Sequence, residues 1–307
     1  DPCTRFLPKI LDENIYDAVD PGLAAKMHKA IAVIQFKVEG QIVKRRPEFH
    51  MDERTHITAI DFEKGTVSIR GKDYKMLDMN FPTIDPKDPL KLTKEEEELV
   101  HNLCMSFKHS STLHRHIRFI YSHGGMYKCC NSNLLYHGCI PMKENGEFDE
   151  LNLNGIIYSG KRLLDYIEDA VKMAYFLPED DASKEWYQDF MWYLWCGRKS
   201  PLSGRNTKTF ERTYVLDEST WYEESNPYYK FYEEEKVCNM ILHEFGLYSE
   251  RAHIINGHTP VRTSKGEHPV RANGKLMVID GGFCKSYHKT TGIAGYTLIF
   301  NSHGIRI

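Results

Sequence analysis

The sequence predicts a layered protein of the α/β or α+β class, in which helices cover one or more sheets. Stretches with apolar residues at helical spacing alternate with short apolar stretches of strand type, and strands dominate towards the C-terminal end. Apolar residues make up 41% of the 307 residues, which is enough to build a substantial core. An alternation of this kind favours a sandwich of sheets and helices.

The first 92 residues predict a helix, a β-hairpin and a linker. Apolar residues recur at helical spacing over 23–38. Alternating apolar residues over 55–77 flank a glycine-containing turn at 63–66, which is typical of a hairpin. The stretch 81–92 holds three prolines with aspartates between them and resembles a linker. We therefore expect one segment over 1–92 and a second over 93–307.

The second segment predicts a series of helices interrupted by short strands. Thr93 and Glu96 have the spacing of a capping box at the start of a helix. Gly246 provides a stop after a helix that begins at Asn226. The expected helices are 93–107, 113–121, 160–176, 184–196 and 226–245, and the expected strands are 133–136, 253–255, 276–279 and 296–300.

Charge and composition argue against several classes of function. The net charge is −3, and acidic and basic residues are interspersed without the basic stripe of a nucleic-acid-binding protein. No apolar run is long enough to predict a membrane span, and no signal peptide is visible. The eight cysteines include no Cys-x-x-Cys pair, which favours reduced thiols in a cytoplasmic protein.

Two segments share one design, in which an apolar strand leads to a histidine among small residues. The stretch 133–136 runs into His137 and Gly138, and the stretch 253–255 leads through Gly257 to His258. A strand that ends in this way places an imidazole at the rim of a sheet, where ligand sites form. Two such histidines are a candidate pair of ligands for one metal ion, although buried structural histidines would give the same pattern.

Two further segments are candidates for binding an anion. The strand-like stretch 276–279 ends at Asp280, and a polar loop containing Lys285 follows it. The loop 198–205 contains Arg198, Lys199 and Arg205, and arginine side chains suit the oxygens of a phosphate. An ordinary connecting loop in the first case and a solvated basic loop in the second remain open as alternatives.

The order of these motifs resembles the C-terminal half of the calcineurin-like phosphoesterases. His-Gly-x-x-Pro at 137–141 is followed by the arginine-bearing loop, by Asn-Gly-His-Thr-Pro at 256–260, and by a strand into Asp-Gly-Gly at 280–282. The longer segments 131–142, 251–261 and 275–298 resemble the large class 3 fructose-1,6-bisphosphatases of bacteria. The resemblance covers the whole chain.

This resemblance implies a β-sandwich flanked by helices and a site for two metal ions, usually manganese. By motif position, His137 and His258 would ligate one ion, and Arg198 or Arg205, with Lys199 and Lys285, would bind substrate phosphate. The implied reaction is the hydrolysis of fructose 1,6-bisphosphate, a step of gluconeogenesis. A sugar bisphosphate is then the expected small-molecule partner, with no nucleic acid and no membrane, and a homo-oligomer is compatible with the sequence.

One half of the family's motifs does not occur in this chain. Asp-x-His, Gly-Asp-x-x-Asp-Arg-Gly and Gly-Asn-His followed by an acid are absent, and the first residue is Asp1 rather than methionine. The resemblance therefore implies that the catalytic residues lie upstream of Asp1, in a missing N-terminal half. Two alternatives stay open: another calcineurin-like phosphatase, acting on phosphoproteins or dinucleoside polyphosphates, and a non-catalytic regulatory or oligomerisation fragment.

Overall fold

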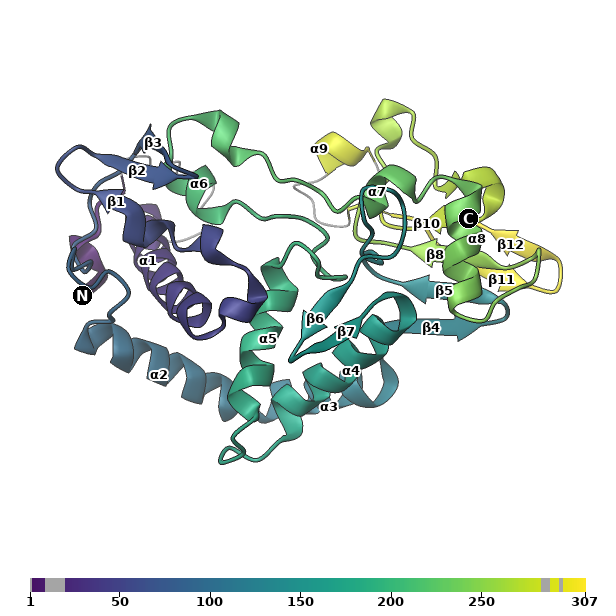
Figure 1. The fold of residues 1–307 in the computed structure, drawn as a ribbon, viewed down its shortest axis with the longest axis horizontal. Helices are drawn as coiled ribbons and strands as arrows, with labels where there is room; N and C mark the ends of the chain where they lie inside the picture. The colour runs from purple at the N-terminus through teal and green to yellow at the C-terminus, as the bar shows by residue number, and fades with distance from the viewer. Residues whose placement is uncertain (1, 9–19, 283–287, 293–294) are drawn as a thin grey trace. The chain divides into compact units, whose positions relative to one another are not determined.

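The computed structural model describes residues 2–8, 20–282, 288–292 and 295–307. The fold mixes helices with several small sheets (Figure 1), as the sequence predicts for the α/β or α+β class. The chain forms two compact units: unit 1 comprises Asp1–Arg118 and Lys208–Glu223, and unit 2 comprises Phe119–Thr207 and Glu224–Ile307. No helix in the described part of the chain is long and apolar enough to cross a membrane.

Unit 1 is built on a long helix and a small antiparallel sheet. Helix α1 spans Pro21–Arg45, and the side chain of Asp20 caps its first turn by accepting a hydrogen bond from the backbone of Leu23. The predicted helix over 23–38 is therefore confirmed and is longer than expected. The sheet has the order β1-β2-β3, with β1 at Ile60–Asp61, β2 at Thr66–Ile69 and β3 at Lys72–Lys75.

The hairpin predicted over 55–77 is present, but its strands are shorter than expected. His56–Ala59 forms a 3₁₀ helix (η5) rather than a strand. A second turn at Arg70 and Gly71, both with positive φ, adds the strand β3. The remaining 3₁₀ helices of unit 1 are η1 at Pro2–Arg5, η3 at Pro47–Phe49, η4 at Asp52–Arg54 and η6 at Glu218–Trp221.

Unit 1 also contains the helices α2 and α6 and the first part of α3 (Ser111–His123), which continues into unit 2. Helix α2 spans Lys94–Lys108, and the capping box of Thr93 and Glu96 that the sequence predicts is formed. Helix α6 at Thr209–Tyr214 comes from a distant part of the chain and joins the unit through a backbone bridge between Met76 and Val215. The predicted division after residue 92 stays a prediction; in the structure, the proline-rich stretch before it buries Phe81 and Ile84 in the core of unit 1.

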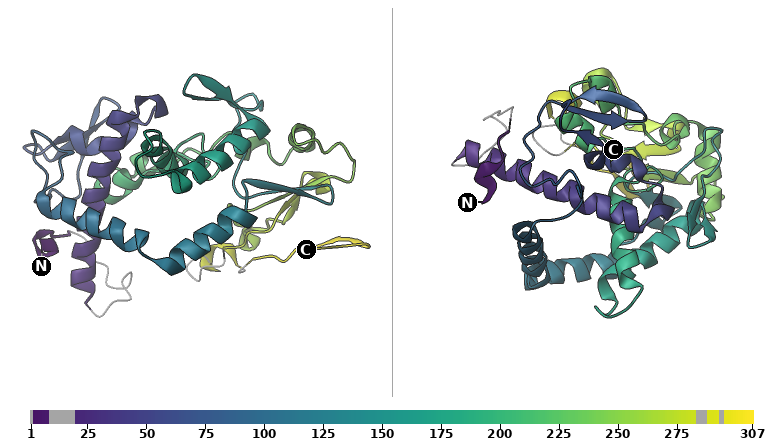
Figure 2. Two further views of the ribbon diagram at one scale, coloured as in Figure 1. Left: turned by 90° about the horizontal axis from the view of Figure 1, so that it is seen from below. Right: turned by 60° about the vertical axis from the view of Figure 1, so that its left-hand side comes forward.

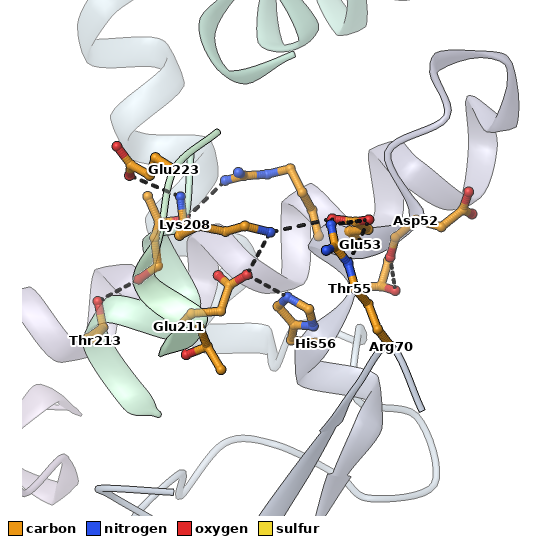
Figure 3. A network of polar contacts seen from close by, with 12 residues as sticks. Asp52, Glu53, Thr55, His56, Arg70, Lys208, Glu211, Thr213 and Glu223 are labelled. Atoms are coloured by element: carbon orange, nitrogen blue, oxygen red, sulfur yellow. Dashed lines mark hydrogen bonds and ion pairs between the residues drawn. The ribbon is translucent and has the colours of Figure 1, made fainter. Parts of the chain in front are cut away.

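The core of unit 1 contains several buried ion pairs beside its apolar side chains. Their nitrogen–oxygen distances range from 2.7 to 3.0 Å, and the pairs are Lys29–Asp78, Lys37–Glu96, Arg54–Glu39 and His56–Glu211. Figure 3 shows the last of these, where Glu211 on α6 also lies 3.2 Å from Lys208, which reaches on to Glu53. Buried charges of this kind are tolerated only when they are paired.

Unit 2 contains a five-stranded mixed sheet of order β4-β5-β8-β10-β9, whose three middle strands are parallel (Figure 1). The outer strands β4 and β9 run antiparallel to their neighbours. The predicted strands at 133–136, 253–255 and 276–279 are confirmed. The bounds are β4 Tyr127–Cys130, β5 Asn133–Tyr136, β8 His253–Asn256, β9 Val270–Arg271 and β10 Leu276–Val278.

Helices and two small hairpins surround this sheet. Helices α4 and α5 pack against each other, and Figure 2 shows them side by side, while α8 contacts β8. The predicted helices over 113–121, 160–176 and 184–196 are confirmed. The bounds are α3 Ser111–His123, α4 Gly160–Phe176, α5 Lys184–Cys196, α7 Tyr228–Phe231, α8 Glu235–Glu244 and α9 His288–Thr291, with β6 Leu151–Leu153, β7 Ile156–Tyr158, β11 Ile299–Asn301, β12 Gly304–Arg306, η7 Thr263–Lys265 and η8 Ala272–Gly274.

Two expected elements differ in the structure. The single helix predicted over 226–245 is wrong, because the chain breaks between α7 and α8, where Glu234 is extended. Glu234 thereby becomes the N-cap residue of α8, and the side chains of Tyr232 and Glu233 at this break contact Arg271. The strand predicted at 296–300 is displaced to Ile299–Asn301 and pairs with β12 rather than with the five-stranded sheet.

Candidate active site

The topology of unit 2 brings three of the sequence motifs to one edge of the sheet. Strands β5 and β8 are parallel neighbours in which Tyr136 stands opposite Asn256, and Asn256 in turn stands opposite Val278 of β10. Parallel strands end at the same edge, so His137, His258 and Asp280 all follow strand ends there. His137 and Asp280 line one open cavity of about 870 Å³ at this edge.

The two predicted histidines contact each other. Nδ1 of His258 lies 3.2 Å from Nε2 of His137, and the rings meet edge to face. Nε2 of His258 lies 3.1 Å from the carbonyl oxygen of Ser203. Because a carbonyl can only accept, Nε2 of His258 carries the proton and Nδ1 keeps a lone pair directed at His137. A histidine that ligates a metal commonly donates its other N–H to a backbone carbonyl in this way.

The backbone is unusual at His258 and closely packed beside His137. His258 has φ +64°, a left-handed conformation that is uncommon for a residue other than glycine. A side chain at Gly138 would place its Cβ 2.0 Å from the carbonyl oxygen of Pro201, so only glycine fits. Such departures are concentrated where the surrounding structure fixes a functional group.

A buried amide holds the two histidine loops together. The side chain of Asn256 lies 2.9–3.1 Å from the carbonyl oxygens of Tyr136, His137 and Gly138, to which its NH₂ group can donate. Asn256 is almost fully buried, and these contacts fix the path of the chain on both sides of His137. The sequence interpretation named the motif that contains Asn256 but gave this residue no role of its own.

The electrostatic surroundings keep His258 neutral. Burial lowers the pKa of His258 below its ordinary value, and the neighbouring His137 and the positive charge of Arg205 lower it further. A neutral imidazole with an available lone pair is the form that ligates a metal. The donor chemistry of the two histidines therefore fits a divalent ion such as Mn²⁺.

Two histidines do not complete a metal site. Within the described residues, no group of three or more His, Cys, Asp or Glu side chains comes close enough to hold an ion. Asp280 lines the same cavity as His137. Its charge raises the pKa of His258, but this effect is smaller than the effects that lower it. These residues can supply ligands from one side of a site.

The basic loop that the sequence singled out lies beside the histidines. Cys139 donates a backbone hydrogen bond to Pro201, and Ser203 accepts one from His258, so the loop touches both histidine segments. Its basic residues have different surroundings. Arg198 is half-exposed and pairs with Glu224 at 3.0 Å, while Lys199 pairs with Asp149 at 3.0 Å.

Arg205 differs from Arg198 and Lys199 in its contacts. Its Nε atom is buried without a hydrogen-bond partner, and its guanidinium forms no ion pair within the part of the chain that the structure describes. Lys285, the fourth predicted phosphate ligand, lies outside the described residues. The roles of these four residues in binding substrate stay predictions.

Comparison with known proteins identifies the family of the chain. The sequence model of the family described as Firmicute fructose-1,6-bisphosphatase matches residues 1–307. Three similar relatives, each named fructose-1,6-bisphosphatase class 3, come from Clostridium novyi, Clostridium tetani and Listeria innocua. Their identities are 51%, 53% and 50% over 306, 305 and 308 residues.

The alignments with these relatives cover nearly all of this chain but less than half of each relative. They include 99–100% of this chain and 46–47% of each relative, so the chain spans about half the length of the curated relatives it matches. No solved structure matches the chain. The match over all 307 residues nevertheless shows that the chain belongs to the Firmicute fructose-1,6-bisphosphatase family.

Proposed function

We propose that the chain supplies one side of the active site of a metal-dependent phosphomonoesterase. The reaction would be the hydrolysis of fructose 1,6-bisphosphate to fructose 6-phosphate and phosphate, a step of gluconeogenesis. The names of the relatives support the substrate. The observation that carries the proposal is the contact between two histidines, His137 and His258, that follow the ends of adjacent parallel strands.

His137 and His258 would hold a manganese ion, with Asp280 close by at the same edge of the sheet. When bound, the metal supplies Lewis acidity and a water of lowered pKa. The protein's own contribution is positional: Ser203 fixes the protonated nitrogen of His258, and Asn256 fixes the loop that carries His137. The two-metal site and the calcineurin-like β-sandwich that the resemblance implies are part of this proposal. The remaining metal ligands would come from the part of the relatives that this chain does not match.

The test uses the full-length enzyme that contains this chain. Replacing His258 by alanine should remove most of the metal from one of two positions and abolish turnover of fructose 1,6-bisphosphate. Metal content is measured by elemental mass spectrometry, which gives a readout independent of activity. The matched control is His253→Ala, on the same strand, because His253 bonds the carbonyl of Gly274 and takes no part in the pair. A His258 variant that keeps both ions and a normal rate would refute the assignment.

A further inference from the structure

Unit 2 contains a second cavity, of about 690 Å³, that neither histidine lines. Arg205 enters it from the basic loop, Tyr229 from α7, Thr259 and Arg262 from the segment after β8, and Arg271 from the end of β9. The sequence interpretation grouped Arg205 with Arg198 and did not connect it to any of these residues. The fold thus places three guanidinium groups around one cavity, together with several hydroxyl groups that include those of Tyr229 and Thr259.

Three polar atoms of this cavity lack ordinary hydrogen-bond partners. Nε of Arg205 and the hydroxyl groups of Thr259 and Tyr229 are buried without a hydrogen bond of ordinary geometry, although the two hydroxyl groups interact with each other. A buried donor with no acceptor destabilises a fold by about 1–3 kcal/mol, so native proteins rarely leave one without a reason. Donors of this kind favour a ligand with several acceptor oxygens in the cavity that their residues line.

The charges around the cavity favour an anion as that acceptor. Arg262 is held by Glu267 at 2.7 Å, and Arg271 contacts Glu233 and Glu267. These two carboxylates orient two of the three guanidinium groups but leave an excess of positive charge among the lining residues. Arg205 supplies this excess, because it forms no ion pair with any residue that the structure describes.

Two features suit the cavity to a phosphate group in particular. Burial raises the pKa of the Tyr229 hydroxyl well above its ordinary value, so this group stays protonated and can donate. Arginine presents parallel N–H groups that match phosphate oxygens. A phosphate monoester could therefore accept hydrogen bonds from Arg205, Tyr229 and Thr259 together.

The cavity begins next to the candidate metal ligands. Thr259 directly follows His258 in the chain, and Arg205 lies two residues after Ser203, whose carbonyl accepts the hydrogen bond from His258. The charge of Arg205 also acts on His258. A molecule that presents one phosphate to the histidines could thus reach the cavity with another part.

We propose that this cavity, with Arg205, Tyr229 and Thr259 as its donors, binds the phosphate group of the substrate that is not hydrolysed. The inference rests on the proposed function, because it takes the substrate to be a bisphosphate. A separate phosphorylated compound could present the same chemical group, and the experiment distinguishes these two sources.

The experiment compares two substrates in the full-length enzyme. Fructose 1,6-bisphosphate carries a second phosphate, whereas p-nitrophenyl phosphate has none. Arg205→Gln and Tyr229→Phe should each raise KM for the bisphosphate, by about ten- to a hundredfold for the arginine and less for the tyrosine. Each change should lower kcat/KM by a larger factor for the bisphosphate than for p-nitrophenyl phosphate, because only the bisphosphate has a second phosphate to bind in the cavity. Lys230→Gln is the matched control, since Lys230 is the exposed neighbour of Tyr229 and pairs with Glu144.

Three other outcomes of this experiment would contradict either the second phosphate site or the proposed function. Equal losses on both substrates, or lost metal, would place Arg205 at the histidines and overturn the proposal. An unchanged KM for the bisphosphate, with calorimetric binding of inorganic phosphate lost, would assign the cavity to a free phosphate ligand and also overturn it. If the wild-type enzyme hydrolyses p-nitrophenyl phosphate but not fructose 1,6-bisphosphate, the proposed function fails, and this result is distinct from a failure of the second site.

Discussion

Asn256 illustrates how one side chain can govern a site without being a ligand. Its amide is positioned to donate to the carbonyls on both sides of His137, while its own backbone is one residue from Gly257 and two from His258. A change in this amide therefore reaches both histidines at once. Groups that orient ligands in this way commonly alter metal affinity by ten- to a hundredfold when they are replaced.

The first prediction concerns this residue. In the full-length enzyme, Asn256→Ala should weaken manganese binding by about ten- to a hundredfold, because the carbonyls around His137 lose their common donor. Equilibrium dialysis with Mn²⁺ measures the change. Asn133→Ala is the control, since Asn133 is equally buried in the same sheet and bonds the carbonyl of Asn131 near the opposite end of β5. Equal loss of metal in both variants would reduce Asn256 to a general structural role.

Among single residues, the sequence predicted the pair of histidines that follow strand ends. It did not predict the role of Asn256, which depends on backbone carbonyls distant in the sequence. His137 and His258 could be paired because both follow apolar strands, and the ends of parallel strands meet. The partners of Asn256 lie 118–120 residues earlier in the chain, and backbone carbonyls carry no sequence signal. Arg205 could not be connected to Tyr229 and Arg271 before the fold was known, because these residues are also distant from it in the sequence.

The elements of unit 1 are joined by buried charges, and α6 depends on them most. Glu211 on α6 faces His56 of η5 at 3.0 Å and Lys208 at 3.2 Å (Figure 3). Burial opposes ionisation of Glu211, but the hydrogen bond from His56 and the charges of His56 and Lys208 outweigh it, so its pKa lies below the ordinary value. The ionised carboxylate therefore stabilises the folded state.

The second prediction follows from the sign of this shift. A carboxyl group whose pKa is lowered on folding contributes stability above its unfolded pKa and loses it as the pH falls through the folded pKa. Glu211→Gln should cost about 3 kcal/mol of unfolding free energy at pH 7 and progressively less below pH 4.5. Urea unfolding at several pH values measures the difference. Glu53→Gln, a half-exposed carboxylate of the same network, should cost less than about 1 kcal/mol, and equal costs would contradict the argument.

Elements with a strong local sequence signal were predicted well, whereas the break between α7 and α8 and several short strands were not. The capping box at Thr93 and Glu96 marked the start of α2 because both partners lie within one turn. The helix expected over 226–245 breaks at the extended residue Glu234, and the apolar spacing that predicted one helix continues across this break. The strands β4, β6 and β7 were missed because they are only three or four residues long, which is too short to establish a period of two.

The two units show what sequence order conceals in the molecule as a whole. Residues 208–223 return to unit 1, where Leu77 donates a backbone hydrogen bond to Tyr214 and Leu216 donates one to Lys75. No periodicity in the sequence indicates such a return. A local pattern shows which side of a helix or strand is apolar, but not which distant segment packs against it. Each unit nevertheless buries an apolar cluster of its own. We therefore expect residues 1–307 to fold, at least in part, without further chain.

The last prediction is that residues 1–307, produced alone, fold but do not turn over fructose 1,6-bisphosphate. Two-metal hydrolysis requires both ions to be held together, and groups that act as a unit do not lose activity in proportion to their number. His137, His258 and Asp280 cannot supply the ligands of two ions, so removing the rest should abolish the rate rather than halve it. We expect a folded circular dichroism spectrum and only background release of phosphate in the presence of Mn²⁺.

Adding the separately produced remainder of the full-length sequence should restore this release if the two parts assemble, and His258→Ala should prevent the restoration while His253→Ala should not. A rate close to that of the full-length enzyme from residues 1–307 alone would show that another set of residues in the chain performs the reaction. The comparison also separates folding from catalysis, because the spectrum and the phosphate assay are read on the same sample. The predicted site is supported if replacing His258 lowers both the bound metal and the rate of phosphate release.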